Sequence, residues 1–145
     1  MYTRESRLDV SMKAIGVGVF ALLVVGCAHP PTSRSGAVHD IRVIEGPEPV
    51  DVVVNPGDEV RWVNARNLAV RVDLVGIKRE DLSCERGFSN LFGMFRESAT
   101  IDPNKSASVC FSTAGAVGYN VRMDSALPGG KKIVPGVVRI GEMKK

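Results

Sequence analysis

The sequence is poor in aromatic residues and in histidine, and it lacks any dense cluster of charge of one sign. Aromatic residues make up 6% of the 145 residues, and only two residues are histidine. The 19 basic and 16 acidic residues give a net charge of +3 and are dispersed, so neither nucleic-acid binding nor a polybasic membrane patch is predicted. With 44% hydrophobic and 24% charged residues, the composition is typical of a globular protein.

The short motifs that mark common catalytic and nucleotide-binding sites are also missing. The sequence has no GxSxG nucleophile elbow, no HExxH zinc motif, no P-loop and no glycine-rich dinucleotide fingerprint. Its acidic residues are dispersed or adjacent to arginine and lysine. We therefore expect that the protein is not an enzyme, and we predict no catalytic residue and no cofactor.

The apolar run near the start of the chain is too short to cross a bilayer. It extends over 11 residues from Ile15 to Val25 and follows Lys13, whereas a spanning helix needs about 20 residues. A basic residue followed by a short apolar run is typical of a secretory signal. The sequence therefore predicts export rather than membrane spanning.

The end of this run resembles the lipobox of bacterial lipoproteins. It reads Leu23-Val24-Val25-Gly26-Cys27, with a small residue before the cysteine. The resemblance implies that residues 1–26 are a signal peptide and that Cys27 becomes the lipidated, palmitate-bearing N-terminus. The alternative is an ordinary signal peptide with a chance cysteine.

The resemblance also implies a location. In such lipoproteins an aspartate after the cysteine commonly retains the protein at the inner membrane, and Ala28 stands there instead. We therefore expect a lipid anchor in the outer membrane, with the domain in the periplasm. Met12 begins a more typical signal than Met1, so we expect the true start at Met12. Residues 27–37, rich in proline, serine and small residues, are predicted to be a lipidated tether.

A single all-β domain is predicted over residues 38–141, followed by a C-terminal tail at 142–145. Short runs of alternating apolar and polar residues are separated by Gly, Pro and Asn, which is typical of a β-sandwich or barrel. Eight strands are expected: Val38–Ile44, Val50–Val54, Asp58–Asn64, Leu68–Val75, Ala99–Asp102, Ser106–Ser112, Val117–Met123 and Ile133–Ile140.

Residues 76–98 interrupt this pattern and are expected to form an insertion. Four bulky residues fall at i, i+3, i+4 and i+7, the spacing of one helical face: Phe88, Leu91, Phe92 and Phe95. We expect a short irregular helix whose apolar face plugs an open end of the sandwich. The alternative is an exposed partner-binding patch made of the same four residues.

Two cysteines remain once Cys27 is lipidated, and they predict a disulfide. Cys84 and Cys110 form an even pair in an exported chain. Cys110 alternates with Val109 and Phe111, so its side chain is expected on the outer face, where it can capture the start of the insertion. The alternative, in which the two thiols bind copper(I) or exchange redox equivalents, lacks a CxxC spacing or a nearby histidine.

Two segments resemble the cupredoxins, the plastocyanin and azurin type of Greek-key β-sandwich. These are Asn55-Pro-Gly-Asp-Glu-Val-Arg-Trp-Val-Asn64 and Phe111-Ser-Thr-Ala-Gly-Ala-Val-Gly-Tyr119, with Gly136-Val-Val-Arg-Ile-Gly141 closing the domain. The resemblance implies a Greek-key sandwich over residues 38–141. It also implies a type 1 copper site, which needs two imidazoles and a thiolate.

The residues at the implied ligand positions do not suit copper. Leu68 and Ala69 stand where the family has its first histidine, Val121 near its cysteine and Asp124 near its second histidine. The two histidines are His29, in the tether, and His39, at the start of the first strand; both are expected to be solvated surface residues rather than ligands. No metal site is predicted.

Two hypotheses for function follow. The preferred one is an envelope lipoprotein whose copper-less, cupredoxin-like sandwich is a binding or structural module, monomeric, with the insertion facing an envelope protein partner. The alternative is a divergent copper-binding or electron-transfer protein with a non-family ligand set drawn from the cysteine pair, Met94, Met123 or a histidine.

Overall fold

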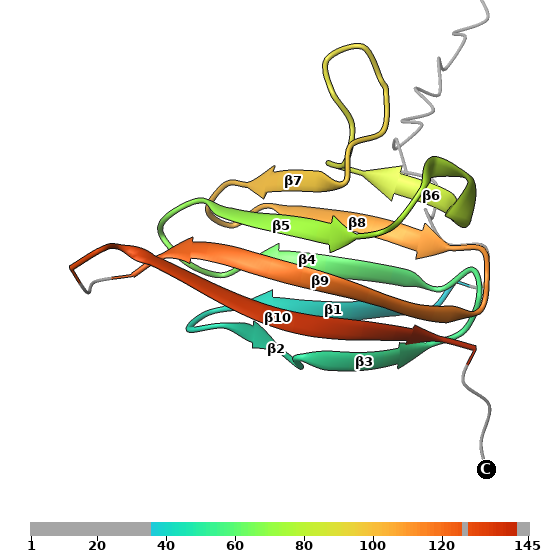
Figure 1. The fold of residues 1–145 in the computed structure, drawn as a ribbon, viewed down its shortest axis with the longest axis horizontal. Coiled ribbons are helices and arrows are strands. Elements are labelled where there is room, and N and C mark those ends of the chain that lie inside the picture. Colours follow the sequence, from blue (N-terminus) through green and yellow to red (C-terminus); the bar gives the residue numbers. More distant parts are fainter. Residues whose placement is uncertain (1–35, 126–127, 142–145) are drawn as a thin grey trace, which may run out of the picture.

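The computed structural model describes residues 36–125 and 128–141, which form a sandwich of two five-stranded β-sheets (Figure 1). The strands are β1 (Val38–Val43), β2 (Pro47–Glu48), β3 (Asp51–Val54), β4 (Glu59–Asn64), β5 (Val70–Val75), β6 (Leu82–Arg86), β7 (Ser98–Ile101), β8 (Ser106–Phe111), β9 (Gly115–Asp124) and β10 (Lys131–Ile140). One 3-10 helix, η1 (Arg79–Asp81), precedes β6. No helix within the described residues is long and apolar enough to span a membrane.

The order of strands ties the two layers together. The first sheet has the order β2-β1-β4-β8-β6, and the second has the order β3-β10-β9-β5-β7. β1 is parallel to β4 and β3 is parallel to β10, while the other neighbours are antiparallel. The chain passes from one sheet to the other at every connection from β2 to β9. The predicted all-β sandwich is confirmed.

The eight predicted ranges all contain or overlap a strand, and two strands were not predicted. β2 is only two residues long, and β6 lies inside the supposed insertion. β9 and β10 also begin earlier than expected, because they pair as one long hairpin in which Gly115 faces Ile140 and Asp124 faces Lys131. The alternating pattern does not extend to the ends of this hairpin, where pairing alone maintains the strands.

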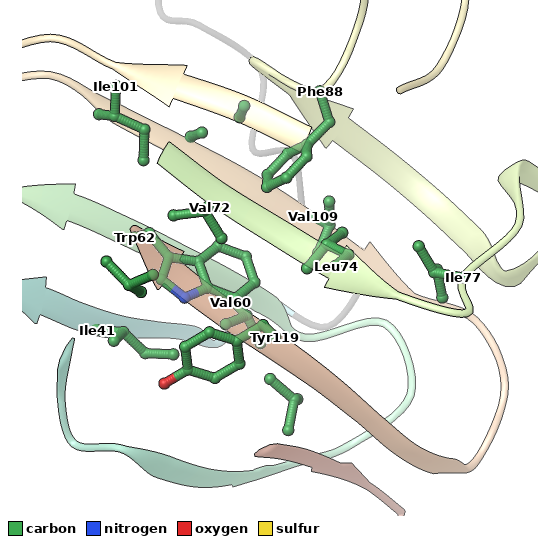
Figure 2. Close-up of a cluster of buried hydrophobic side chains, with 14 of the residues drawn as sticks. Ile41, Val60, Trp62, Val72, Leu74, Ile77, Phe88, Ile101, Val109 and Tyr119 are labelled. Carbon is green, nitrogen blue, oxygen red and sulfur yellow. The ribbon is translucent and has the colours of Figure 1, made fainter. Parts of the chain in front are cut away.

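The core lies between the sheets and is centred on three aromatic rings (Figure 2). Trp62 of β4 is fully buried, and its ring lies edge-to-face with Phe88 at 5.8 Å and with Tyr119 at 5.3 Å between centroids. These geometries are favourable for aromatic pairs. The cluster therefore joins three parts of the chain: β4 through Trp62, β9 through Tyr119, and the loop that follows β6 through Phe88.

Tyr119 also links β9 of the second sheet to Val50, the residue just before β3. Its hydroxyl donates a hydrogen bond to the carbonyl oxygen of Val50 at 2.6 Å. Gly136 faces Tyr119 across the β9–β10 ladder, and a Cβ atom there would lie 2.3 Å from the Val50 oxygen and 2.4 Å from the tyrosine hydroxyl. Only glycine leaves space for this hydrogen bond.

The segment 76–98 departs from the prediction of a helical insertion. Its first part forms η1 and then β6, which pairs with β8 as the edge strand of the first sheet. Its second part is a loop without helix, in which Ser89 and Phe95 form an isolated antiparallel bridge. The prediction of a short helix over Phe88, Leu91, Phe92 and Phe95 is therefore wrong.

Candidate functional site

The candidate site is the loop of residues 87–97 between β6 and β7, which Figure 1 shows extending away from both sheets. Its two halves are joined at the base. The Arg96 amide donates a hydrogen bond to the Phe88 carbonyl oxygen at 2.7 Å. The Phe88 side chain points into the core against Trp62 and is fully buried. A buried aromatic anchor therefore fixes where the loop leaves the sandwich.

The Cys84–Cys110 disulfide provides a second anchor close to this base. The two cysteines are register partners on β6 and β8, with their Cα atoms 4.8 Å apart. Cys110 lies on the face opposite to Val109 and Phe111, as predicted from the alternation, and it is nevertheless fully buried. The predicted disulfide is confirmed.

Gly87 makes the turn from β6 into the loop. Its φ angle is +83°, which L-residues with side chains rarely adopt. A Cβ atom at this position would lie 2.8 Å from the Ala107 Cβ. The chain therefore passes directly over β8 here, and this brings Phe88 into the core.

The tip of the loop is closed by one side chain, that of Asn90. Its Oδ1 accepts hydrogen bonds from the amides of Phe92 and Met94, both at 2.9 Å. In addition, the Asn90 amide donates to the Met94 carbonyl at 2.9 Å, and the Gly93 amide donates to the Asn90 carbonyl at 3.0 Å. Side-chain capping of this kind fixes a turn without help from neighbouring strands.

The apolar side chains at this tip point into solvent. Leu91 is fully exposed, Phe92 is 86% exposed and Met94 is 61% exposed. Phe95 packs partly against the core, and Phe88 is entirely inside it. The expectation that all four predicted residues plug the sandwich is thus wrong for Leu91 and Phe92, and the alternative patch cannot include the buried Phe88. The burial follows from the loop geometry: residues at the base face the core and residues at the tip cannot reach it.

A polar hollow lies beside the base of the loop. It is lined by Arg71 of β5, Arg96 and the hydroxyl-bearing residues Ser89, Ser98 and Thr100, together with Glu97. Arg71 is exposed; it donates to the Ser98 hydroxyl at 3.1 Å and forms an ion pair with Asp73 at 2.7 Å. The site thus combines an apolar tip with guanidinium groups and hydroxyls below it.

The end of the sandwich where the resemblance implies copper carries a guanidinium group and apolar side chains. Asn64 Nδ2 donates to the carbonyl oxygens of Leu68 at 2.9 Å and Ile101 at 2.8 Å, which fixes the loop after β4. Arg66 Nη2 then donates to the Asp124 carbonyl at 2.8 Å. A guanidinium cation and apolar side chains do not fit a copper ion, which needs imidazole and thiolate donors.

Among residues 36–125 and 128–141, no three His, Cys, Asp or Glu side chains are grouped as metal ligands would be. Met123 is buried in the core, whereas Met94 is at the exposed loop tip. The predicted signal peptide and residues 27–35 of the predicted tether, with Cys27 and His29, lie outside the described residues.

His39 differs from the expected solvated imidazole. Its side chain is about one-third exposed, and Nε2 lies 3.0 Å from Oδ2 of the buried Asp58. The same carboxylate oxygen accepts the Asn55 amide at 2.9 Å. Asp58 therefore links the Asn-Pro-Gly-Asp turn to β1, which is a structural role. The sequence pattern gave no signal for this pair, because the residues are 19 positions apart and meet only through the parallel β1–β4 ladder.

The comparisons with known proteins concern the fold. No protein-family model matches the chain, and no curated protein does. Similar solved structures include a Cu(I) methionine variant of amicyanin, with 19% identity and a TM-score of 0.47 over 72% of this chain and 82% of that one. An oxidised proline variant of amicyanin, also at 19% and 0.47, covers 73% and 83%, and a reduced tryptophan variant, at 16% and 0.47, covers 72% and 82%. Amicyanin is a cupredoxin. The strand pairing described above, rather than this likeness, establishes the two-sheet architecture.

Proposed function

We propose that this protein is a lipid-anchored binding module of the bacterial cell envelope, built on a cupredoxin-like sandwich without copper. The observation that carries the proposal is the 87–97 loop, which presents Leu91, Phe92 and Met94 to solvent on a doubly anchored base. Single exposed apolar residues are ordinary, but three grouped at one projecting tip are typical of an interaction site.

The energetics of the loop favour a binding role over a purely structural one. Exposing apolar surface forgoes roughly 25 cal/mol for each Å² that burial would stabilise. The chain forms the tip nonetheless and closes it with the Asn90 hydrogen bonds. A tip that is already ordered loses little conformational entropy when it binds, and this favours affinity.

The lipid anchor rests on the lipobox-like residues 23–27, and it is tested by Cys27→Ser. Acylation supplies most of the membrane affinity of such a protein. We expect the wild-type chain in the outer-membrane fraction and the variant without incorporated palmitate, released from that fraction at high salt. A variant that stays membrane-bound without palmitate would contradict the lipid anchor. Ser35→Ala is the control, because it changes a hydroxyl-bearing residue of the predicted tether and touches neither the lipobox nor the disulfide.

Copper binding is the competing function, and a titration distinguishes the two. Copper(I) and copper(II) are added separately to the purified protein, followed by gel filtration and metal analysis. We expect no stoichiometric retention, because Leu68 and Ala69 stand where the resemblance implies a histidine, and the Arg66 guanidinium lies beside Asp124. Retention of one copper per chain with intense visible absorption would overturn the copper-free module.

A further inference from the structure

The 87–97 loop combines features that suit a lipid surface better than a protein partner. We infer that its tip inserts into the interface of a bilayer containing anionic phospholipid and thereby holds the anchored domain in one orientation. The inference deepens the proposed function and rests on it for the lipid anchor. Its occupant is the membrane; a second copy of this chain is an outcome of the test.

The first argument is the hydrogen bonding of the tip. Backbone amides that enter an apolar medium must be satisfied within the protein, because no water is available to them. The amides of Phe92 and Met94 are bonded to Asn90 Oδ1, and those of Asn90, Gly93 and Arg96 are bonded to carbonyls of the loop. These five amides can therefore leave water without breaking their hydrogen bonds.

The second argument is size. A specific protein–protein interface buries about 1,200 Å² or more in total. Three side chains on a narrow projection offer only a few hundred Å², roughly 150–250 Å² for the aromatic one. A bilayer interface needs no complementary surface, so a small apolar tip such as Leu91, Phe92 and Met94 is sufficient to enter it.

The third argument is charge. Arg71 and Arg96 line the hollow at the base of the loop, together with the hydroxyl-bearing Ser89, Ser98 and Thr100. When the tip is inserted, these groups lie at the level of lipid headgroups, where guanidinium and hydroxyl groups can donate to phosphate oxygens. Glu97 in the same hollow and Asp73, which forms an ion pair with Arg71, limit the excess of positive charge, so a modest preference for anionic lipid is expected, with Arg96 as its main source.

The fourth argument is reach. The described residues begin at Gly36, just before β1. Across the first sheet the successive partners are Val38, Glu59, Cys110 and Cys84. Three strand spacings place the start of β1 roughly 15 Å from Cys84, and the residues from Phe88 to Phe92 carry the tip up to roughly 13 Å further. The residues from Cys27 to Gly36 can extend over about 30 Å. An anchor at Cys27 and the loop tip can thus contact one bilayer.

The test places a fluorescent reporter at the tip of the full, acylated chain. Phe92→Trp is reconstituted in vesicles of phosphatidylethanolamine and phosphatidylglycerol, with and without brominated acyl chains, which quench tryptophan at short range. The matched control is Val53→Trp, because Val53 is 55% exposed on β3, the edge of the second sheet far from β7. Trp62 is buried in both variants and contributes the same background.

We expect brominated lipid to remove most of the emission from the tip reporter and none from the control. Adding Leu91→Ser and Met94→Ser to the reporter chain should restore the emission, and Arg96→Gln should weaken quenching more in vesicles with phosphatidylglycerol than in neutral ones. An unquenched tip on a chain that floats with the vesicles would overturn the loop insertion while leaving the anchor intact. The insertion would also be overturned if the tip tryptophan stayed unquenched by lipid and became buried from solvent as the protein concentration rose. That result would assign the loop to contact with a second copy of the chain.

Failure of the anchor gives a separate signal, since the chain would then not float with the vesicles. The loop is in that case tested with the same chain and an excess of vesicles in solution. Quenching of the tip under those conditions supports the insertion, and its absence overturns it.

Discussion

Removal of the Cys84–Cys110 disulfide should destabilise the protein most strongly around the candidate loop. The double variant Cys84→Ala with Cys110→Ala removes the crosslink without adding a polar group at the buried position of Cys110. The two cysteines are 26 residues apart. Loop-closure entropy for that separation gives about 3.5 kcal/mol of stabilisation, with native-state contacts as a further contribution. This is a large fraction of the roughly 5–15 kcal/mol that stabilises a typical domain.

The loss should be uneven because the strands differ in their other contacts. β6 is an edge strand that pairs with β8 alone among the described strands, and its register is interrupted between Leu82 and Cys84. The other strands enclose the aromatic core around Trp62 and Tyr119, which does not depend on the crosslink. Local opening of β6 and the loop therefore becomes easier than global unfolding.

The assay is hydrogen exchange with peptide-level resolution, combined with urea unfolding. We expect hydrogen exchange over residues 82–97 to accelerate the most. The urea midpoint of unfolding should fall by about 3.5 kcal/mol divided by the m value. A reductant should change the wild-type protein in the same way and leave the double variant unchanged. Equal acceleration in all strands would refute the reasoning, since the bridge would then be essential to the entire fold. Free thiols at both positions in protein from an oxidising compartment would refute the bridge itself.

Three further predictions concern the core. Trp62→Ala should cost about 3–5 kcal/mol in the free energy of unfolding, because it removes a fully buried ring and leaves a cavity between Phe88 and Tyr119; an unchanged melting temperature would contradict the core assignment. Gly136→Ala should cost at least about 1–3 kcal/mol, since its Cβ would collide with Tyr119 and the Val50 carbonyl, and Tyr119→Phe should relieve part of this loss when the two are combined. Burial, aided by the Asp51 carboxylate, raises the pKa of Tyr119 above its ordinary value of 10.0; the unfolded chain therefore ionises first, and stability should fall as the pH rises above about 10. Tyr119→Phe should abolish that dependence in alkaline urea titrations, and an unaltered slope would contradict the assigned cause.

The strands could be predicted because their side chains alternate between the buried core and the solvent-exposed outer face. Val60 and Trp62 alternate with polar residues, and in the structure the first two are fully buried while Arg61 is on the outer face with Asp40. The disulfide was anticipated from an even pair of cysteines in an exported chain, and the same alternation placed Cys110 opposite to Val109. Where the alternation failed, at β2 and β6, the strands are maintained by their neighbours rather than by their own pattern.

The helical interpretation of the loop failed because two different structures share one spacing. Phe88 and Phe95 are seven residues apart and both face the core, as they would on a helix. In the structure they are the two sides of a hairpin-like base, and Leu91 and Phe92 are the tip between them. Asn90 and the two glycines at 87 and 93, both with positive φ, decide in favour of the loop. They are turn residues, and their signal was outweighed by the apolar periodicity.

The contacts around Arg66 and His39 were beyond reach of the sequence for another reason. Arg66 meets the Asp124 carbonyl 58 positions later, and His39 meets Asp58 through a parallel ladder. Local sequence patterns do not predict such contacts, because each contact depends on which strands become neighbours in the folded sheets. What the sequence does show directly is the residue type at each position where the resemblance implies a copper ligand, such as Leu68 and Val121. Residue types do not reveal which side chains meet in space.

The anchors at the base of the loop explain how an apolar tip can remain exposed on a small sandwich. A flexible segment with Leu91, Phe92 and Met94 would gain free energy by folding back onto the nearest apolar surface. Phe88 in the core, the disulfide before it and the Asn90 hydrogen bonds at the tip remove that freedom. The same restraints leave little entropy to be lost when the tip enters a binding environment. The stability of the base therefore determines whether the tip stays exposed. Weakening either anchor should reduce the binding proposed for the tip, even where all three apolar side chains are kept.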